Sequence, residues 1–249
     1  MLPALTAAYQ GEMKRTRQAV ADHVASVWRR LPDYRDEQVP GFLQAALPVV
    51  QAGQRRAVAL TSAYLSRALG APPVGLDVET LVGAAVRNGM DPAEVYRRPF
   101  VTTWAAIAKI GVQAAIEKGL SRLTSTADMD VAMSGRDTLL AYQRVAPAVE
   151  SDRIIGWRRV AEPGCCDFCL SIDGAHTGPD EPQPLHNRCG CTADPITAGS
   201  SLVGALLGVG SRIDKTVIRE HGELGPVITA HGDSFAGPDD LDDPDYIES

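Results

Sequence analysis

The five cysteines of the chain all lie between residues 165 and 191. They form two runs, and a histidine opens the second run: Cys165, Cys166 and Cys169, then His186, Cys189 and Cys191. In a Cys-x-x-Cys turn both sulfurs point the same way, so Cys166 and Cys169 can supply half of a tetrahedral shell at about 2.3 Å per Zn–S bond. The other half can come from His186 with Cys189, or from Cys189 with Cys191. The spacing therefore predicts a structural zinc site.

Five candidates compete for the four positions of such a site: Cys166, Cys169, His186, Cys189 and Cys191. Cys165 is the expected spare, because the Cys166–Cys169 gap is the better one. A closed four-ligand site leaves no position for water, so it stabilises a fold and does no chemistry by itself. The spacing leaves two alternatives open, namely one or two disulfides, or free thiols.

Composition indicates an ordinary soluble protein, with 45% hydrophobic and 22% charged residues. No apolar run reaches the roughly eighteen residues of a membrane span, so we expect no membrane association and synthesis in the cytoplasm. The formal net charge of −7 argues against nucleic-acid binding through bulk electrostatics, which needs a basic face. We therefore expect no direct, sequence-specific binding to nucleic acid.

Most of the net negative charge comes from one segment, residues 237–249. This segment contains no Lys or Arg and six acids: Asp239, Asp240, Asp242, Asp243, Asp245 and Glu248. Without them the net charge would be about −1. Such a segment is typical of a solvated, disordered tail. The alternative is a flexible arm that docks on a basic partner surface.

The first 150 residues predict a series of helices. One long amphipathic helix is expected up to Pro32, because apolar residues recur near every third or fourth position: Leu2, Leu5, Tyr9, Met13, Val20, Val24, Val27 and Leu31. The basic residues of this segment, Arg17 among them, fall off that stripe. A second helix is expected from near Pro40 to Gly70, and Asp77 is a plausible cap for a short third one.

A clear helix start follows at residues 91–94, where an aspartate cap precedes a proline and an acid. Pro99 predicts a break or kink. Beyond it, a helical face is expected over residues 100–119 and a last helix over 128–145, ended by Pro147. The apolar stripes on these helices predict core packing.

Around residue 150 the pattern changes from helical to β. Residues 153–160 are rich in β-branched and aromatic side chains and predict a strand; 174–184 predict a loop, and 192–196 and 227–230 two more short strands. The expected fold class is α+β, mainly α, with a long-helix N-terminal domain followed by a small β-rich Cys/His module. The expected parts are a helical domain (1–150), the module (151–198), a C-terminal extension (199–236) and an acidic disordered tail (237–249).

The module resembles that of the phage Mu F-like minor head proteins, which serve head morphogenesis in tailed phages. The resemblance covers residues 151–198 and rests on Trp157-Arg158-Arg159-Val160, the Cys-x-x-Cys turn, a Gly/Pro-rich loop, the His-x-x-Cys-x-Cys run and Asp194-Pro195-Ile196. All five ligand candidates match the family pattern. Two positions depart from it: Asn187 replaces a common proline, and Gly190 a common basic residue. Residues 221–229 also look like an extension of relatives from high-GC hosts.

The resemblance implies a structural minor capsid protein located in the virion, in the head at the portal vertex. It implies the phage portal protein as partner, with the major capsid or scaffold protein as further partners, and several copies per particle. It implies no reaction.

Two other functions remain alternatives: a capsid maturation protease, as relatives are sometimes labelled, and an internal protein ejected with the genome. Neither Gly-x-Ser-x-Gly nor His-Glu-x-x-His occurs. No sequence context marks a nucleophile among the serines that we considered: Ser134, Ser200, Ser201 and Ser211. Cys165 or Cys166 with His186 could form a thiol nucleophile and its base. Because the crowded thiols favour metal or disulfide, we expect no enzyme.

Overall fold

The computed structural model describes residues 2–72, 75–149, 154–179, 190–198 and 216–230. Its helical part consists of α1 (Leu2–Arg29), α2 (Val39–Leu69), α3 (Pro92–Ile110) and α4 (Val112–Val149), with the 3-10 turns η1 (Asp36–Gln38), η2 (Val78–Leu81) and η3 (Gly83–Arg87). The remaining elements are β1 (Ile154–Val160), α5 (Asp167–Ser171), β2 (His176–Thr177), β3 (Thr192–Thr197), β4 (Thr216–His221) and β5 (Gly225–Ala230). The predicted fold class, α+β and mainly α, is confirmed.

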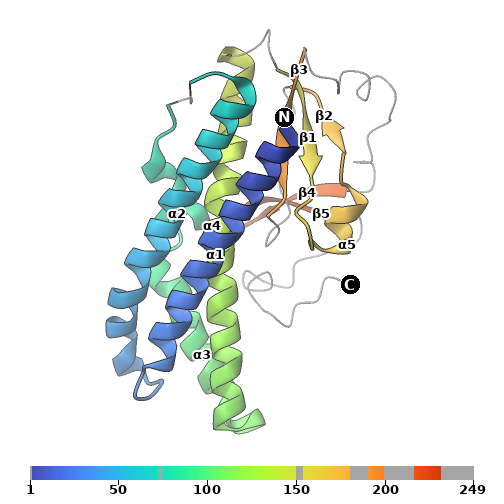
Figure 1. The fold of residues 1–249 in the computed structure, drawn as a ribbon. Coiled ribbons are helices and arrows are strands. Elements are labelled where there is room, and N and C mark those ends of the chain that lie inside the picture. The colour runs from blue at the N-terminus through green and yellow to red at the C-terminus, as the bar shows by residue number, and fades with distance from the viewer. Residues whose placement is uncertain (1, 73–74, 150–153, 180–189, 199–215, 231–249) are drawn as a thin grey trace.

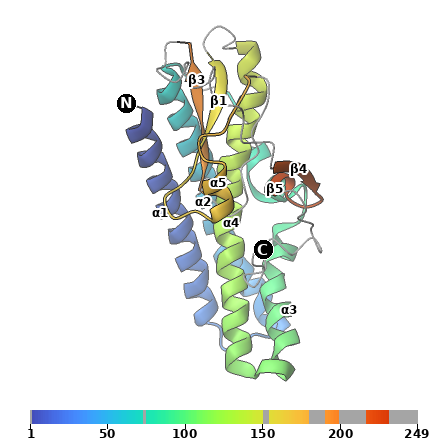
Figure 2. The ribbon, with the colours of Figure 1, turned by 90° about the vertical axis from the view of Figure 1, so that its right-hand side faces the viewer.

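The long helices form an elongated bundle. α1, α2 and α4 run side by side, α3 packs against α4 at one end, and the small sheet lies at the other end (Figures 1 and 2). Three aromatic rings join the helices in the main core: the centroid of Trp28 lies 4.8 Å from that of Phe100 and 6.0 Å from that of Phe42. All three side chains are buried, which is where the apolar stripes were expected.

Several predicted boundaries are confirmed. α1 ends shortly before Pro32, and α2 ends at Gly70, whose φ of 61° closes the helix in the left-handed conformation. Asp91 caps α3 by accepting a hydrogen bond from the Ala93 amide at 2.9 Å. Asp77 also acts as a cap, but it precedes the 3-10 turns η2 and η3 in place of the predicted short helix. Arg17 is buried and donates to Asp128 at 3.0 Å, although the sequence placed it off the apolar stripe.

The predicted boundary at Gly119 is wrong. α3 ends at Gly111, which has a φ of 83°, and α4 runs without interruption through residues 119–128. A Cβ at position 119 would lie 3.0 Å from the Pro99 carbonyl and 3.0 Å from Trp28, and it would collide with the Thr103 hydroxyl. Gly119 therefore allows α4 to approach α1 and α3 closely, and it does not end a helix.

Of the break or kink predicted at Pro99, the break is wrong, because Pro99 lies inside α3; the kink stays a prediction. An interior proline costs about 3 kcal/mol. Val95, Tyr96 and Phe100 on either side of it are fully buried, and their burial outweighs that cost. Pro147 likewise does not end α4, which continues to Val149. A proline this close to the end removes one hydrogen bond of the last turn, and few residues of the helix follow it.

The first sheet is antiparallel with the order β2–β1–β3. The strands predicted over 153–160 and 192–196 correspond to β1 and β3, whereas the predicted loop 174–184 contains β2 and lies outside the described residues from position 180 on. A buried cluster fixes the sheet to α2 and α4: the ring of Trp157 lies 6.3 Å from Tyr142, and Ile154 and Ala193 pack beside Tyr64. The strand predicted over 227–230 is β5, which pairs with β4 in a separate hairpin.

Candidate functional site

The register of the sheet brings the two cysteine runs to the same end of the module. Val160, the last residue of β1, pairs with Thr192, the first residue of β3. Cys191 immediately precedes β3, and the turn that follows β1 leads to Cys165, whose amide donates to the Glu162 carbonyl at 3.0 Å. Antiparallel pairing thus places residues that lie far apart in the sequence next to one another, as a shared site requires.

Backbone amides donate to two of the sulfurs. The sulfur of Cys166 caps α5 and accepts from the Cys169 amide at 3.5 Å, and the sulfur of Cys191 accepts from the Glu162 amide at 3.4 Å. The buried sulfur of Cys169 lies 3.7 Å from Nη2 of Arg159. Amide and guanidinium donors favour the thiolate over the thiol, and the thiolate is the form that binds zinc. These surroundings fit the chemistry of the predicted ligands.

His186 and Cys189 lie outside the described residues, so two of the five ligand candidates are not placed. Within the described ranges, no three His, Cys, Asp or Glu side chains gather closely enough to hold a metal ion, and Cys166, Cys169 and Cys191 alone do not form a site. In the same part of the chain no disulfide joins two cysteines. Cys165, the expected spare, is partly exposed. Zinc and disulfides therefore both stay predictions.

The surroundings of Gly190 leave no room for a side chain. Its amide donates to Oε2 of Glu162 at 2.9 Å, and the same oxygen lies 3.7 Å from Nη1 of Arg17. A Cβ at position 190 would lie 2.5 Å from the carboxyl carbon of Glu162. Any larger residue would displace this carboxylate, which connects the second cysteine run to α1.

Asp194 anchors the module to the helical body, a role that the sequence did not reveal. Its buried carboxylate accepts hydrogen bonds from Oγ1 of Thr6 in α1, at 3.0 and 3.1 Å, and from the hydroxyl of Tyr64 in α2. Burial raises the pKa of Asp194, although the bonds from Tyr64 and Thr6 oppose this rise. Burial and the nearby carboxylate also raise the pKa of Tyr64, so its hydroxyl stays a donor.

A second anchor, also unforeseen, lies at the tip of the β4–β5 hairpin. Glu223 is 3% exposed and accepts a hydrogen bond from Arg87 of η3 at 2.7 Å and three from Arg98 of α3 at 3.0 Å. Arg87 also donates to Asp130 of α4 at 2.7 Å. Burial would raise the pKa of Glu223, but the bonds from Arg98 and the charge of Arg87 outweigh it and leave that pKa lowered. Four charged groups thus neutralise one another where the hairpin meets three helical elements.

The turn between β4 and β5 is stabilised by hydrogen bonds of its own side chains and backbone groups. Nδ1 of His221 accepts from the amides of Glu223 and Leu224 at 3.1 and 3.0 Å, so this imidazole has a structural role. The Leu224 carbonyl accepts from Arg136 of α4 at 2.8 Å, and the Gly222 carbonyl accepts from Asn88 at 2.8 Å. The side chain of Leu224 packs among Val86, Met129 and Met133.

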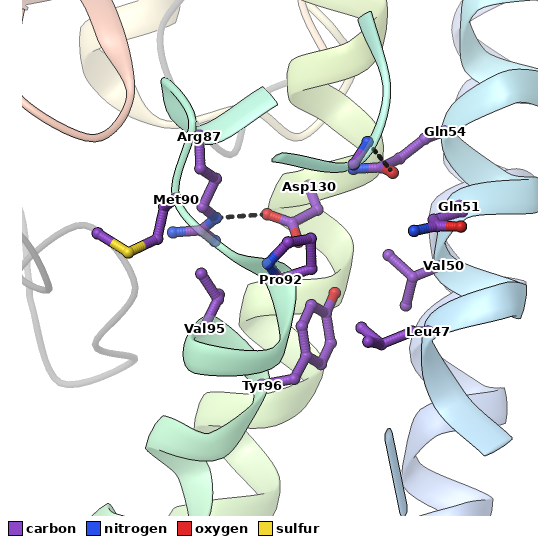
Figure 3. Close-up of a pocket in the computed structure, with 11 residues that line it drawn as sticks. Leu47, Val50, Gln51, Gln54, Arg87, Met90, Pro92, Val95, Tyr96 and Asp130 are labelled. Atoms are coloured by element: carbon purple, nitrogen blue, oxygen red, sulfur yellow. Dashed lines mark hydrogen bonds and ion pairs between the residues drawn. The ribbon is translucent and has the colours of Figure 1, made fainter. Parts of the chain in front are cut away.

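A small cavity lies beside this network of charged groups. Figure 3 shows Arg87 and Asp130 joined on its wall, with Tyr96 and Leu47 on the other sides. Its volume is about 10 Å³, room for about one water molecule and not for a substrate.

Ser134, one of the serines considered as a nucleophile, is fully buried in α4, where its hydroxyl donates a hydrogen bond to the Asp130 carbonyl at 3.4 Å. Ser200, Ser201 and Ser211 lie outside the described residues.

Among the described residues, no helix combines the length and the apolar character that crossing a membrane demands. Comparison with known proteins gives no match to a family model, a curated protein or a solved structure.

Proposed function

We propose that the chain is a structural minor head protein of a tailed phage, in line with its resemblance to the phage Mu F-like group. One observation carries the proposal: Asp194, a residue of that resemblance, is bonded to Thr6 of α1 and Tyr64 of α2. The module and the helical bundle are therefore packed together as one unit. Such a unit suits a protein whose task is to hold contact surfaces in a fixed relation.

Two further residues of the resemblance support a structural role. Trp157 is fully buried and packs its ring edge-on against Tyr142. Arg159 is 2% exposed and lies beside the sulfur of Cys169. Both side chains serve the interior of the module, where they cannot reach a partner or a substrate.

We propose a structural zinc ion for the module, held by Cys166 and Cys169 together with either His186 and Cys189 or Cys189 and Cys191. The amide donors on the sulfurs of Cys166 and Cys191 support this assignment. Bound zinc would supply cross-links and no reaction, and it would stabilise a sheet too small to have a large core. Metal analysis of the purified chain, together with a count of free thiols, distinguishes zinc from disulfides.

The proposed location is the head at the portal vertex, with several copies in contact with the portal protein and with the major capsid or scaffold protein as further neighbours. The elongated bundle supports this proposal, because its long helical faces offer the extended surface that such contacts need (Figure 1).

Purified particles of the phage that encodes the chain provide the test. We expect mass spectrometry to detect the chain in heads both before and after DNA release, and electron cryomicroscopy to locate it at the portal vertex. Absence from the heads would refute the proposal. Loss of the chain with the DNA would instead identify an ejected internal protein.

The protease alternative has its own discriminating variant. In heads that contain Cys166→Ser, the major capsid protein should have its normal mass, because Cys166 is a ligand in the proposal and not a nucleophile. Cys165→Ser tests the other candidate thiol in the same way. An untrimmed major capsid protein in heads that still incorporate either variant would favour the protease.

A further inference from the structure

The α3–α4 helical hairpin lies at the end of the bundle away from the sheet (Figure 2). An open groove of about 450 Å³ lies on this hairpin. Its walls come from both helices, which Gly111 joins in a tight turn. The lining residues used below are Arg98, Val101, Lys109, Ile110, Lys118 and Arg122. A volume of this size accommodates several side chains of a peptide.

The groove has a definite chemical character. Four of its nine lining residues are Lys or Arg and none is Asp or Glu. Because Arg98 already bonds Glu223, the charges that attract acidic groups are those of Lys109, Lys118 and Arg122. Two large apolar side chains stand exposed beside these charges: Val101 is 56% exposed and Ile110 is 50% exposed. The sequence had assigned Ile110 to the core. A suitable ligand combines carboxylates with apolar side chains.

The chain itself contains such a segment. Residues 237–249 hold six Asp or Glu and no Lys or Arg, and they also include Leu241, Tyr246 and Ile247. The carboxylates match the basic side chains of the groove, and the three apolar residues match Val101 and Ile110.

The connection between the groove and this segment is short enough for the same chain. Arg98, which lines the groove, also bonds Glu223 at the tip of the β4–β5 hairpin at 3.0 Å. Even if β5 led directly away from the groove, its six residues Gly225–Ala230 would cover a distance of only roughly 20 Å. Residues 231–238 can span up to about 28 Å, so the acidic segment can return to the groove from the end of β5.

We propose that the α3–α4 groove binds the acidic segment 237–249 of its own chain. The segment then covers the exposed apolar side chains of the groove and neutralises its charge.

Carbodiimide cross-linking of the full-length protein tests the proposal, because this reagent joins carboxylates to lysines in direct contact. An equal mixture of isotopically light and heavy chains separates links within a chain from links between two copies. At low salt we expect Lys109 and Lys118 to link to Asp239–Glu248 within one chain. The yield should fall at least fivefold in 0.5 M salt, where screening shortens the range of attraction to a few ångströms.

Two charge-reversal variants complete the design. In Lys109→Glu/Lys118→Glu, chymotryptic cleavage after Tyr246 should become about tenfold faster, because the segment leaves the groove. In the control Lys14→Glu/Arg30→Glu, with the same charge change on exposed residues of α1 and the loop after it, the cleavage rate should not change. Circular dichroism verifies that both variants fold.

Three outcomes would each overturn the proposal: no links to Lys109 or Lys118, predominantly light–heavy links, which would make a second copy the occupant, or cleavage rates equal to that of the parent in both variants.

Discussion

Replacement of Glu223 by Gln should destabilise the protein far more than the loss of an ordinary ion pair. The side chains of Glu223 and Arg87 are 2% and 3% exposed, and that of Arg98 is 18% exposed. Removal of one partner from a buried pair costs about 3–5 kcal/mol, because the remaining charge stays out of water. Arg87 keeps Asp130 at 2.7 Å, so we expect the low end of this range, about 3 kcal/mol.

Urea unfolding at pH 7 measures this loss, and a thermal scan should show a midpoint lowered by about 6–12 °C. The matched control is Glu79→Gln, which removes the exposed pair between Arg55 and Glu79 at 3.3 Å and should cost less than about 1 kcal/mol. If the two variants lose the same free energy of unfolding, the buried network does not hold the hairpin and the reasoning fails.

The same carboxylate predicts a pH dependence. Because the folded-state pKa of Glu223 is lowered, its stabilisation is complete above the unfolded-state value of about 4.3 and is lost as the pH falls through the folded-state pKa. Acid unfolding of the parent should therefore be steeper below pH 4.3 than that of Glu223→Gln. Parallel acid-unfolding curves would contradict this assignment.

Three further predictions concern the bundle and the module. Gly119→Ala should lower the free energy of unfolding by about 1–3 kcal/mol through its clash with Thr103, whereas the control Gly41→Ala, with open space around the Cβ, should raise it by up to about 1 kcal/mol in the same urea assay. Asp194→Ala should lower the free energy of unfolding by about 2–4 kcal/mol, because it leaves buried hydroxyls without an acceptor. Asp194→Asn should lower it less. The stability of Asp194→Asn should rise relative to that of the parent as the pH rises above about 4, because ionisation of a carboxyl with a raised pKa disfavours the fold. Metal analysis should find that Cys169→Ser loses zinc and that Cys165→Ser retains it; equal zinc contents would refute the ligand assignment.

The elements with a clear local period were predictable from the sequence. α1 shows a helical stripe over eight turns, and β1 combines β-branched and aromatic residues between turn residues, so both could be placed within a few positions. The prediction at Gly119 failed because the sequence does not distinguish a glycine that ends a helix from one that lets two helices pack closely. Only the position of the neighbouring helix separates the two cases. The neighbour here is Thr103, sixteen positions earlier.

The two anchors could not be predicted, because their partners lie far away in the sequence. Asp194 bonds Tyr64 and Thr6 across 130 and 188 positions, and Glu223 bonds Arg98 across 125. Local patterns contain no information at such separations. The cysteine motif was visible because its spacing repeats within each run, and the pairing of β1 with β3 explains why the two runs belong together.

The hairpin anchor also has a consequence for biosynthesis. Arg87 and Glu223 are separated by 136 positions. All four long helices therefore leave the ribosome well before Glu223, which is the second acid, after Asp130, that pairs with Arg87. During that interval Met129 and Met133 lack the cover that Leu224 later provides. A nascent or interrupted chain therefore exposes these two apolar side chains. Chaperones and proteases can recognise such exposed apolar surface and so distinguish incomplete chains from complete ones.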